Sequence, residues 1–262
     1  MRRLSLLNLW FSKRKLVLGL AAIPVVTVPL LWCLAIWGVS SAPIASATAA
    51  RTYTTNFPLT ENPISEGGKW INGAAVGLDW SNVQTTPGLA FDVSGAGYND
   101  GTALLAGSWG PDQTAQATVR CKNPSSGIYQ EVELRLRSSL SAHVATGYEI
   151  NARCLRGDPA SYLYIVRWNG ALGNFTTLAG GAGAQYGVTD GDVLKASIIG
   201  NVITVYVNGS QMATATDSVY ANGSPGMGFD LTNSTAYSDS GFTNFMATDG
   251  PLPPTGLSAA PH

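Results

Sequence analysis

The segment YQEVELRLRSS, residues 129–139, alternates charged and apolar side chains. Because successive side chains of a β-strand point to opposite faces, Glu131, Glu133, Arg135 and Arg137 would share one face of an extended strand. Two carboxylates beside two guanidiniums fit three kinds of surface. They could form an acid pair that cleaves a glycosidic bond, a polar surface that hydrogen-bonds sugar hydroxyls, or a solvated ladder of paired charges.

Two later segments would extend this face. GYEINARC (147–154) and YLYIVRW (162–168) alternate in the same way and would add polar and aromatic side chains to it. Aromatic rings pack against the apolar C–H faces of sugar rings, and charged or amide groups hydrogen-bond the hydroxyls. We therefore predict a carbohydrate-binding face if the three segments form neighbouring strands. The predicted binding residues are Glu131, Glu133, Arg135, Arg137, Asn151, Arg153, Tyr162, Tyr164 and Trp168. The alternative is a solvated face whose opposite charges pair across strands, each pair contributing a few tenths of a kcal/mol.

Short strands must position this face. Residues 51–249 are rich in Gly, Ser, Thr, Asn, Val and Tyr, and no stretch sustains the periodicity of an amphipathic helix. Gly200-Asn201 and Asn208-Gly209 are two-residue hairpin turns that join three strands into a meander. Many short strands at regular spacing predict an all-β sandwich or barrel. The predicted strands cover residues 89–93, 102–106, 116–120, 129–137, 148–155, 162–168, 175–179, 193–199, 202–207, 211–216, 227–231 and 241–248.

The first 50 residues differ in composition from the rest of the 262-residue chain. They contain five basic residues and no acid, and an apolar run over residues 16–39 precedes the small residues SSAPIASATAA. This order is typical of a secretory signal cleaved near residues 45–49. The alternative is an uncleaved signal anchor, because the apolar run is long enough to span a bilayer. Both interpretations put the rest of the chain outside the cytoplasm, and only an uncleaved segment would contact a membrane.

The chain after residue 50 is mildly acidic. It holds ten basic and 16 acidic residues, a formal charge of −6, and no basic tract, which argues against nucleic acid as a partner. Residues 51–249 are enough for one sizeable core. Residues 250–262 form a Pro-rich tail or linker.

Cys121 and Cys154 are the two cysteines outside the apolar N-terminal run, which contains Cys33. Each shares its strand face with apolar residues, and an even number of cysteines in an exported domain favours a disulfide between them. The alternative is a pair of buried free thiols.

The meander, SPGMGFD (224–230) and SGFTNFMATD (240–249) together resemble the concanavalin A-like lectin/glucanase domains, the laminin G-like jelly rolls of secreted bacterial and phage proteins. The resemblance covers about residues 56–249. It implies a two-sheet antiparallel jelly-roll sandwich with a concave face that often holds saccharide, while the function of such a fold varies. The matching residues are Gly191, Asp192, Gly200, Tyr206, Asn208, Gly209, Gly226, Gly228, Phe242, Asn244, Phe245 and Asp249.

Glycoside hydrolases share this fold, so a glycosidase is one alternative. Glu131 and Glu133 have a spacing that suits a retaining enzyme, whose two carboxyls lie about 5–5.5 Å apart. However, the E-x-D-x-x-E pattern of laminarinase-type glucanases would place its third acid at Leu136. Arg135 should also lower the pKa of both carboxyls, whereas a general acid needs a raised pKa.

A polysaccharide lyase of similar fold is the other enzymatic alternative. Such an enzyme needs an arginine and a His/Tyr pair for proton transfer, and Arg135, His143 and Tyr164 are available. The Q-x-H motif of these enzymes is missing, because Ser-Ala-His stands at residues 141–143. A histidine in this polar segment is expected to be exposed to solvent.

Asp249 matches the position of a structural Ca²⁺ ligand in the family. Ca²⁺ needs several oxygen ligands, and no compact Asp-rich loop accompanies Asp249, so the alternative is an aspartate that hydrogen-bonds nearby backbone. No other cofactor is expected.

We predict an exported, non-catalytic, lectin-like domain whose partner is a polysaccharide or another glycan, secreted or at the cell surface. The alternatives are the two enzyme classes and a structural cell-surface module or filament subunit without a small ligand.

Overall fold

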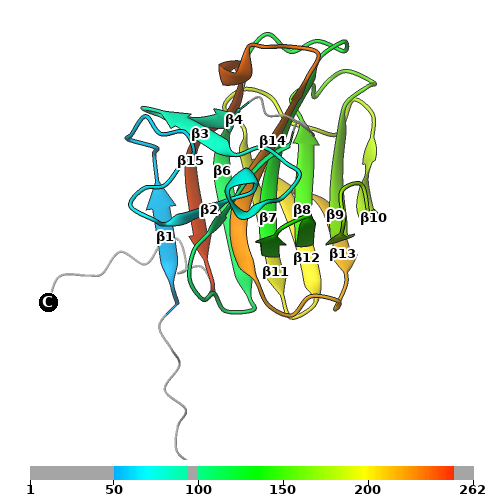
Figure 1. Ribbon diagram of the computed structural model, residues 1–262. Helices are drawn as coiled ribbons and strands as arrows, with labels where there is room; N and C mark the ends of the chain where they lie inside the picture. The colour runs from blue at the N-terminus through cyan, green and yellow to red at the C-terminus, as the bar shows by residue number, and fades with distance from the viewer. Residues whose placement is uncertain (1–49, 94–99, 251–262) are drawn as a thin grey trace, which may run out of the picture. The chain divides into compact units, whose positions relative to one another are not determined.

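Two antiparallel β-sheets make up the fold of the computed structural model, which describes residues 50–93 and 100–250 (Figure 1). The signal predicted over residues 1–50 lies outside the described residues except for Ala50, and so does the predicted tail except for Gly250. No helix within the described ranges is long and apolar enough to cross a membrane.

One sheet has eight strands. Its order is β13 (Ser210–Thr216), β12 (Val202–Val207), β11 (Val193–Ile199), β6 (Gln113–Cys121), β15 (Ser240–Thr248), β4 (Leu89–Asp92) and β3 (Val83–Thr86), and β1 (Thr52–Thr55) also pairs with β15. The meander predicted from the two hairpin turns is confirmed as β11-β12-β13. At its second turn Asn208 and Gly209 have φ values of 51° and 80°, a left-handed conformation that Asn and Gly adopt readily.

The other sheet has seven strands. Its order is β10 (Phe175–Ala182), β9 (Tyr162–Gly170), β8 (Val144–Arg153), β7 (Tyr129–Ser141), β14 (Ser224–Thr232), β5 (Asp100–Leu105) and β2 (Trp70–Asn72). Two short 3-10 helices, η1 (Ala74–Val76) and η2 (Tyr237–Asp239), complete the described elements. All twelve predicted strands occur, whereas β1, β2 and β3 were not predicted. These three strands are only three or four residues long, too short for a clear alternation.

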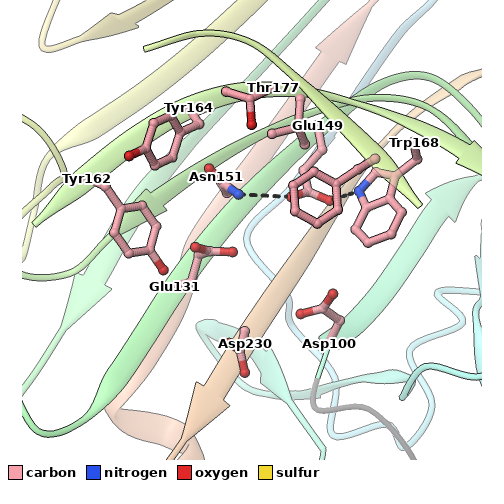
Figure 2. Close-up of a pocket in the computed structure, with 11 residues that line it drawn as sticks. Asp100, Glu131, Glu149, Asn151, Tyr162, Tyr164, Trp168, Thr177 and Asp230 are labelled. Carbon is pink, nitrogen blue, oxygen red and sulfur yellow. Dashed lines mark hydrogen bonds between the residues drawn. The ribbon is translucent and has the colours of Figure 1, made fainter. Parts of the chain in front are cut away.

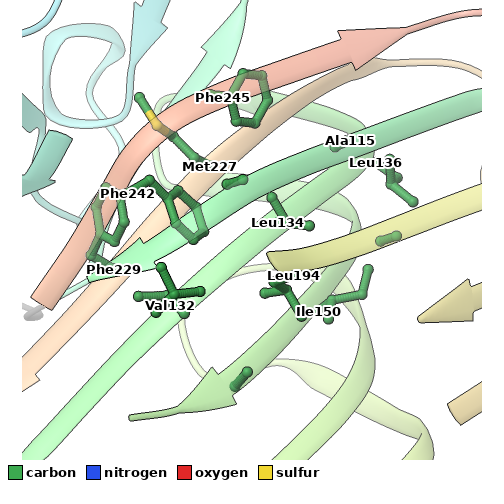
Figure 3. Packing of buried hydrophobic residues seen from close by; sticks show 14 of the residues in the cluster. Ala115, Val132, Leu134, Leu136, Ile150, Leu194, Met227, Phe229, Phe242 and Phe245 are labelled. Carbon is green, nitrogen blue, oxygen red and sulfur yellow. The ribbon is translucent and has the colours of Figure 1, made fainter. Parts of the chain in front are cut away.

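The core lies between the sheets and follows the predicted alternation of β7. Val132, Leu134 and Leu136 are fully buried and pack in one cluster with apolar residues of both sheets, including Phe229 of β14 and Phe242 of β15 (Figure 3). The rings of Phe229 and Phe242 meet edge to face with centroids 5.1 Å apart. Burying one such side chain stabilises the fold by about 1.5–3 kcal/mol. The charged residues of β7 therefore belong to the opposite, outer face of the seven-stranded sheet.

The predicted disulfide between Cys121 and Cys154 is confirmed. Cys121 ends β6 in the eight-stranded sheet, and Cys154 directly follows β8 in the seven-stranded sheet. The bond therefore ties the two sheets together at one end of the sandwich.

Candidate functional site

Cross-strand register gathers polar residues on the outer face of the seven-stranded sheet. In one row, Asp100 of β5 pairs with Asp230 of β14, Asp230 with Glu131 of β7, and Glu131 with Arg153 of β8. The assumption that β7, β8 and β9 are neighbours is confirmed. Three acids from three strands thus lie side by side, although two of them are far from Glu131 in sequence.

The next two rows combine glycines of β14 with charged residues of β7 and β8. Gly228 lies opposite Glu133, and Gly226 lies opposite Arg135, which is paired in turn with Glu149. A Cβ at position 228 would overlap Glu133 Oε2 and come within 3.1 Å of Arg135 Nε. Gly228 therefore leaves the space in which the Glu133 and Arg135 side chains meet.

Arg135 joins two of the acids. Its guanidinium forms an ion pair with Glu133 through Nη2 and another with Glu149 through Nη1, the second at 2.9 Å. Trp168 Nε1 also donates to Glu149 Oε2 at 2.5 Å, and Asn151 Nδ2 donates to Glu149 Oε1 at 3.3 Å. Three donors therefore hold the Glu149 carboxylate in one orientation.

This face is buried, so the alternative of a solvated charge ladder is wrong. Glu133 and Arg135 are 0% and 2% exposed. The chain after η1 covers them, because the Trp80 ring lies over the Arg135 guanidinium at 4.7 Å and packs against Trp168 with ring centroids 4.5 Å apart. Alternation within β7 shows which residues share a face, but it does not show that a distant segment covers that face.

Burial dominates the electrostatics of the acids. It raises the pKa of Glu131, Glu133 and Asp100 well above the ordinary range, and neighbouring carboxylates add to the shift. The pKa of Asp230 rises to about 6, again mainly through burial. The net pKa of Glu131 and Glu133 is thus raised and not lowered. Arg135 does lower the pKa of Glu133, as predicted, but the loss of hydration outweighs the attraction of one guanidinium. Perturbed carboxyls in a cleft are typical of functional sites.

A pocket of about 440 Å³ opens over this face. Figure 2 shows Tyr162 and Tyr164 along one side of it, Asp100 and Asp230 along the opposite side, and Glu131 between them. The residues that line the pocket are Asp100, Glu131, Glu149, Asn151, Tyr162, Tyr164, Val166, Trp168, Phe175, Thr177 and Asp230. The volume is that of a small-molecule site.

The structure brings together five of the nine predicted binding residues. The five that line the pocket are Glu131, Asn151, Tyr162, Tyr164 and Trp168. Trp168 is only 4% exposed, because Trp80 and Phe175 pack against its ring. It was predicted to point outward on a sugar-binding face, and it lies on that face as part of a packed pocket wall.

The other four predicted residues lie beside or away from the pocket. Glu133 and Arg135 are buried next to Glu149. Arg153 donates to backbone carbonyls, and its guanidinium lies 4.3 Å over the Tyr129 ring. The β7–β8 register shifts after Leu136, and there Arg137 has a φ of 45°.

The register shift after Leu136 is a β-bulge, and it explains why the Arg137 side chain leaves the face predicted for it. Its guanidinium donates to the carbonyls of Pro111, Gly200 and Tyr220 at 2.6, 2.6 and 3.1 Å. These contacts connect β7 to the segment before β6, to the turn between β11 and β12, and to the segment between β13 and β14. A bulge turns the following side chain away from the regular alternation.

Six lining residues were not in the predicted set: Asp100, Glu149, Val166, Phe175, Thr177 and Asp230. Glu149 has a sequence signal, because it alternates with Asn151 on β8. Asp100 and Asp230 have none, since they reach the pocket only through pairing between strands that are distant in the chain.

Asp249 and His143, predicted as a Ca²⁺ ligand and as part of a lyase site, lie outside the pocket. Asp249, the predicted Ca²⁺ ligand, accepts backbone N–H groups on both carboxylate oxygens, from Arg51 at 2.6 Å and from Gly110 at 2.9 Å. His143 lies in the β7–β8 turn and is exposed, as predicted. Its Nδ1 atom is 2.8 Å from Oδ1 of Asp79. The Arg135, His143 and Tyr164 set of a lyase is therefore not assembled around the pocket.

One group of acids among the described residues could hold a cation. Single carboxylate oxygens of Glu131, Glu133 and Glu149 lie within 4.8 Å of one another. Arg135 already forms ion pairs with two of these three acids, so a guanidinium supplies part of the positive charge that a metal would bring.

Solved structures establish the fold. The Emp46p carbohydrate recognition domain in its potassium-bound form aligns with a TM-score of 0.51 and 12% identity over 76% of this chain and 100% of that chain. Its metal-free form aligns with a TM-score of 0.50 and 14% identity, over 76% of this chain and 97% of that chain. The carbohydrate-binding module CBM66 from Bacillus subtilis aligns with a TM-score of 0.47 and 17% identity. This alignment covers 71% of this chain and 96% of that chain. No protein-family profile matches the sequence, and a search of curated proteins finds no relative. The chain has the concanavalin A-like jelly-roll fold, as its sequence predicts.

Replacing Arg135 with methionine should destabilise the protein by about 3–5 kcal/mol, because Glu133 and Glu149 would remain buried without their counter-charge. Urea unfolding at neutral pH would measure the change. Arg156→Met is the matched control, because Arg156 is exposed and its loss should change stability little. A loss below about 1 kcal/mol in Arg135→Met would show that the ion pairs do not maintain the buried acids.

Asp92→Asn should make the stability of the protein less sensitive to a rise in pH between about 4 and about 8. Burial raises the pKa of Asp92 from 3.8 to about 8. The folded state therefore keeps a proton that the unfolded chain loses near pH 4, and stability falls as pH rises from about 4 to about 8. Asparagine removes this contribution, so the variant should gain stability relative to the parent at about pH 8. Urea unfolding across this pH range would test it, with Asp79→Asn as control because the Asp79 side chain is 41% exposed. Equal slopes in all three proteins would contradict it.

Proposed function

We propose that this domain is a lectin-like module that binds a glycan in the pocket over the seven-stranded sheet, outside the cytoplasm. The arrangement of Tyr162 and Tyr164 carries the proposal. Their rings are stacked, with centroids 5.6 Å apart and planes 25° from parallel, and both side chains are partly exposed. Two neighbouring aromatic faces beside polar groups form a platform on which sugar rings can stack.

Hydrogen-bonding groups surround this platform. Asn151 lies beside Tyr164 in the cross-strand register, and Glu131 hydrogen-bonds the Tyr162 hydroxyl. Asn151 Oδ1 is buried without a hydrogen-bond partner among the described residues, so a hydroxyl of a ligand could donate to it. Polar groups that converge on an aromatic wall give a sugar site its orientation and specificity.

The location outside the cytoplasm rests on two observations. The disulfide between Cys121 and Cys154 is typical of oxidising compartments. The first 50 residues have the composition of a secretory signal or signal anchor. Both support a secreted or cell-surface protein whose pocket meets extracellular glycans.

A glycan array probed with the full chain would test the binding proposal. Tyr162→Ala combined with Tyr164→Ala should abolish binding, because the variant loses both stacking faces, each of which contributes about 1 kcal/mol or more. Tyr206→Ala is the control, since Tyr206 lies on β12 of the other sheet beside Lys195. Absence of binding to every glycan would overturn the proposal and favour a structural module.

Glycoside hydrolysis is a second candidate, and the acid cluster favours it. Single oxygens of Glu131 and Glu149 lie within 4.8 Å of each other, near the separation of about 5–5.5 Å that retaining enzymes use. The raised pKa of Glu131 suits a general acid. Three donors hold Glu149 in place, as a nucleophilic carboxylate requires.

Incubating any bound glycan with the protein and assaying new reducing ends would separate binding from hydrolysis. A hydrolase should lose at least about a hundredfold in rate in Glu131→Gln and in Glu149→Gln, because each change removes one carboxyl of the pair. Tyr206→Ala should keep the parent rate. Binding without new reducing ends in the parent protein would reject the hydrolase.

A further inference from the structure

The pocket is unbalanced in charge. Four of its lining residues are the carboxylic acids Asp100, Glu131, Glu149 and Asp230, and four others carry aromatic rings. Among the described residues that line it, none is Lys, Arg or His. The deficit of positive charge is therefore a property of the whole cavity wall.

The nearby guanidiniums are already engaged. Arg135 is paired with Glu133 and Glu149. Arg153 directs its guanidinium to three backbone carbonyls, those of Ser126, Ile128 and Ala160.

The other three pocket acids are therefore less well compensated, although the charge of Arg135 still acts on Asp100. Within the described part of the chain, no ion pair reaches Asp100, Glu131 or Asp230. Glu133 Oε1, which is fully buried directly behind this wall, also has no hydrogen-bond partner. Burial favours the protonated form of these acids. An anionic ligand would therefore leave them neutral, whereas a cationic ligand would supply the counter-charge that stabilises their ionised form.

The aromatic wall indicates which kind of cation fits. Ammonium groups are attracted to aromatic faces, and Tyr162, Tyr164 and Phe175 provide accessible rings beside the acids. A bare metal ion is disfavoured, because Arg135 already pairs with two of the three acids that could ligate it. A sugar with an amino substituent would stack on the tyrosines and place its ammonium group among the carboxylates.

We infer that the pocket selects glycans built from amino sugars with a free, protonated amine, over the same glycans in neutral N-acetylated form and over polyuronates. This inference rests on the proposed function, because it names the ligand class of the same pocket. Glu131, Asp230 and Asp100 are the specificity-determining residues, and the stacked tyrosines supply contacts that do not depend on charge.

Calorimetric titration of the full chain with two tetrasaccharides would test the inference. Tetra-glucosamine and tetra-N-acetylglucosamine differ only in the acetyl groups that remove the charge. The charged form should bind about tenfold tighter or more, as expected for a charge-assisted contact in a buried site. Glu131→Gln and Asp230→Asn should each reduce this ratio towards one. Asp79→Asn should leave it unchanged, because Asp79 is a partly exposed aspartate outside the pocket.

The outcomes separate the inference from the function on which it rests. Equal or tighter binding of the N-acetylated tetramer would overturn the inference and leave glycan binding intact. Binding of neither tetramer, together with an empty glycan array, would overturn both. Selectivity that survives both pocket substitutions would show adsorption to the acidic surface and would also overturn it.

A metal ion is the remaining competitor for the pocket. Calcium chloride titrated alone should give no saturable heat. A saturable calcium isotherm that disappears in Glu131→Gln would assign the counter-charge to a metal and overturn the inference.

Discussion

The pairing of one buried guanidinium with two buried carboxylates is the constraint on which the outer face of the seven-stranded sheet depends. Arg135, Glu133 and Glu149 are almost fully buried, and an ion removed from water in this way is stabilised only by close partners. The two ion pairs therefore fix where β7 and β8 place their side chains. They also leave the acids contributed by β5 and β14 without a guanidinium partner, which gives the pocket its acidic character.

The rest of the sandwich makes this arrangement sterically feasible. Gly228 leaves space for the Glu133 and Arg135 side chains, and Trp80 covers the guanidinium from the outer side. The opposite face of the same strand contributes Val132, Leu134 and Leu136 to the core, which holds β7 in place independently of its charged residues. One strand thus serves the hydrophobic core with one face and the polar site with the other, as the two-residue period of a strand allows.

Much of the fold could be predicted from the sequence, because its signals are local. The alternation of β7 and the Asn208-Gly209 turn depend on neighbouring residues alone, and the meander and the buried face of β7 were predicted from them. The site depends on contacts that local patterns do not contain. Asp230 reaches Glu131 only through the pairing of β14 with β7, and Trp80 comes from a segment about 50 residues before β7. The bulge at Arg137 also needs its partner strand to define it.

Stability alone does not account for the acid cluster. Burial raises the pKa of Glu131, Glu133 and Asp100, which means that ionising these groups opposes folding at neutral pH. Well-packed apolar side chains in place of a buried ion pair are often neutral or stabilising. A module that served only as a spacer would gain nothing from this cluster, whereas a binding site uses unbalanced charge next to a cavity. The location of the destabilising groups, around the pocket and under its wall, therefore favours a ligand-binding role over a purely structural one.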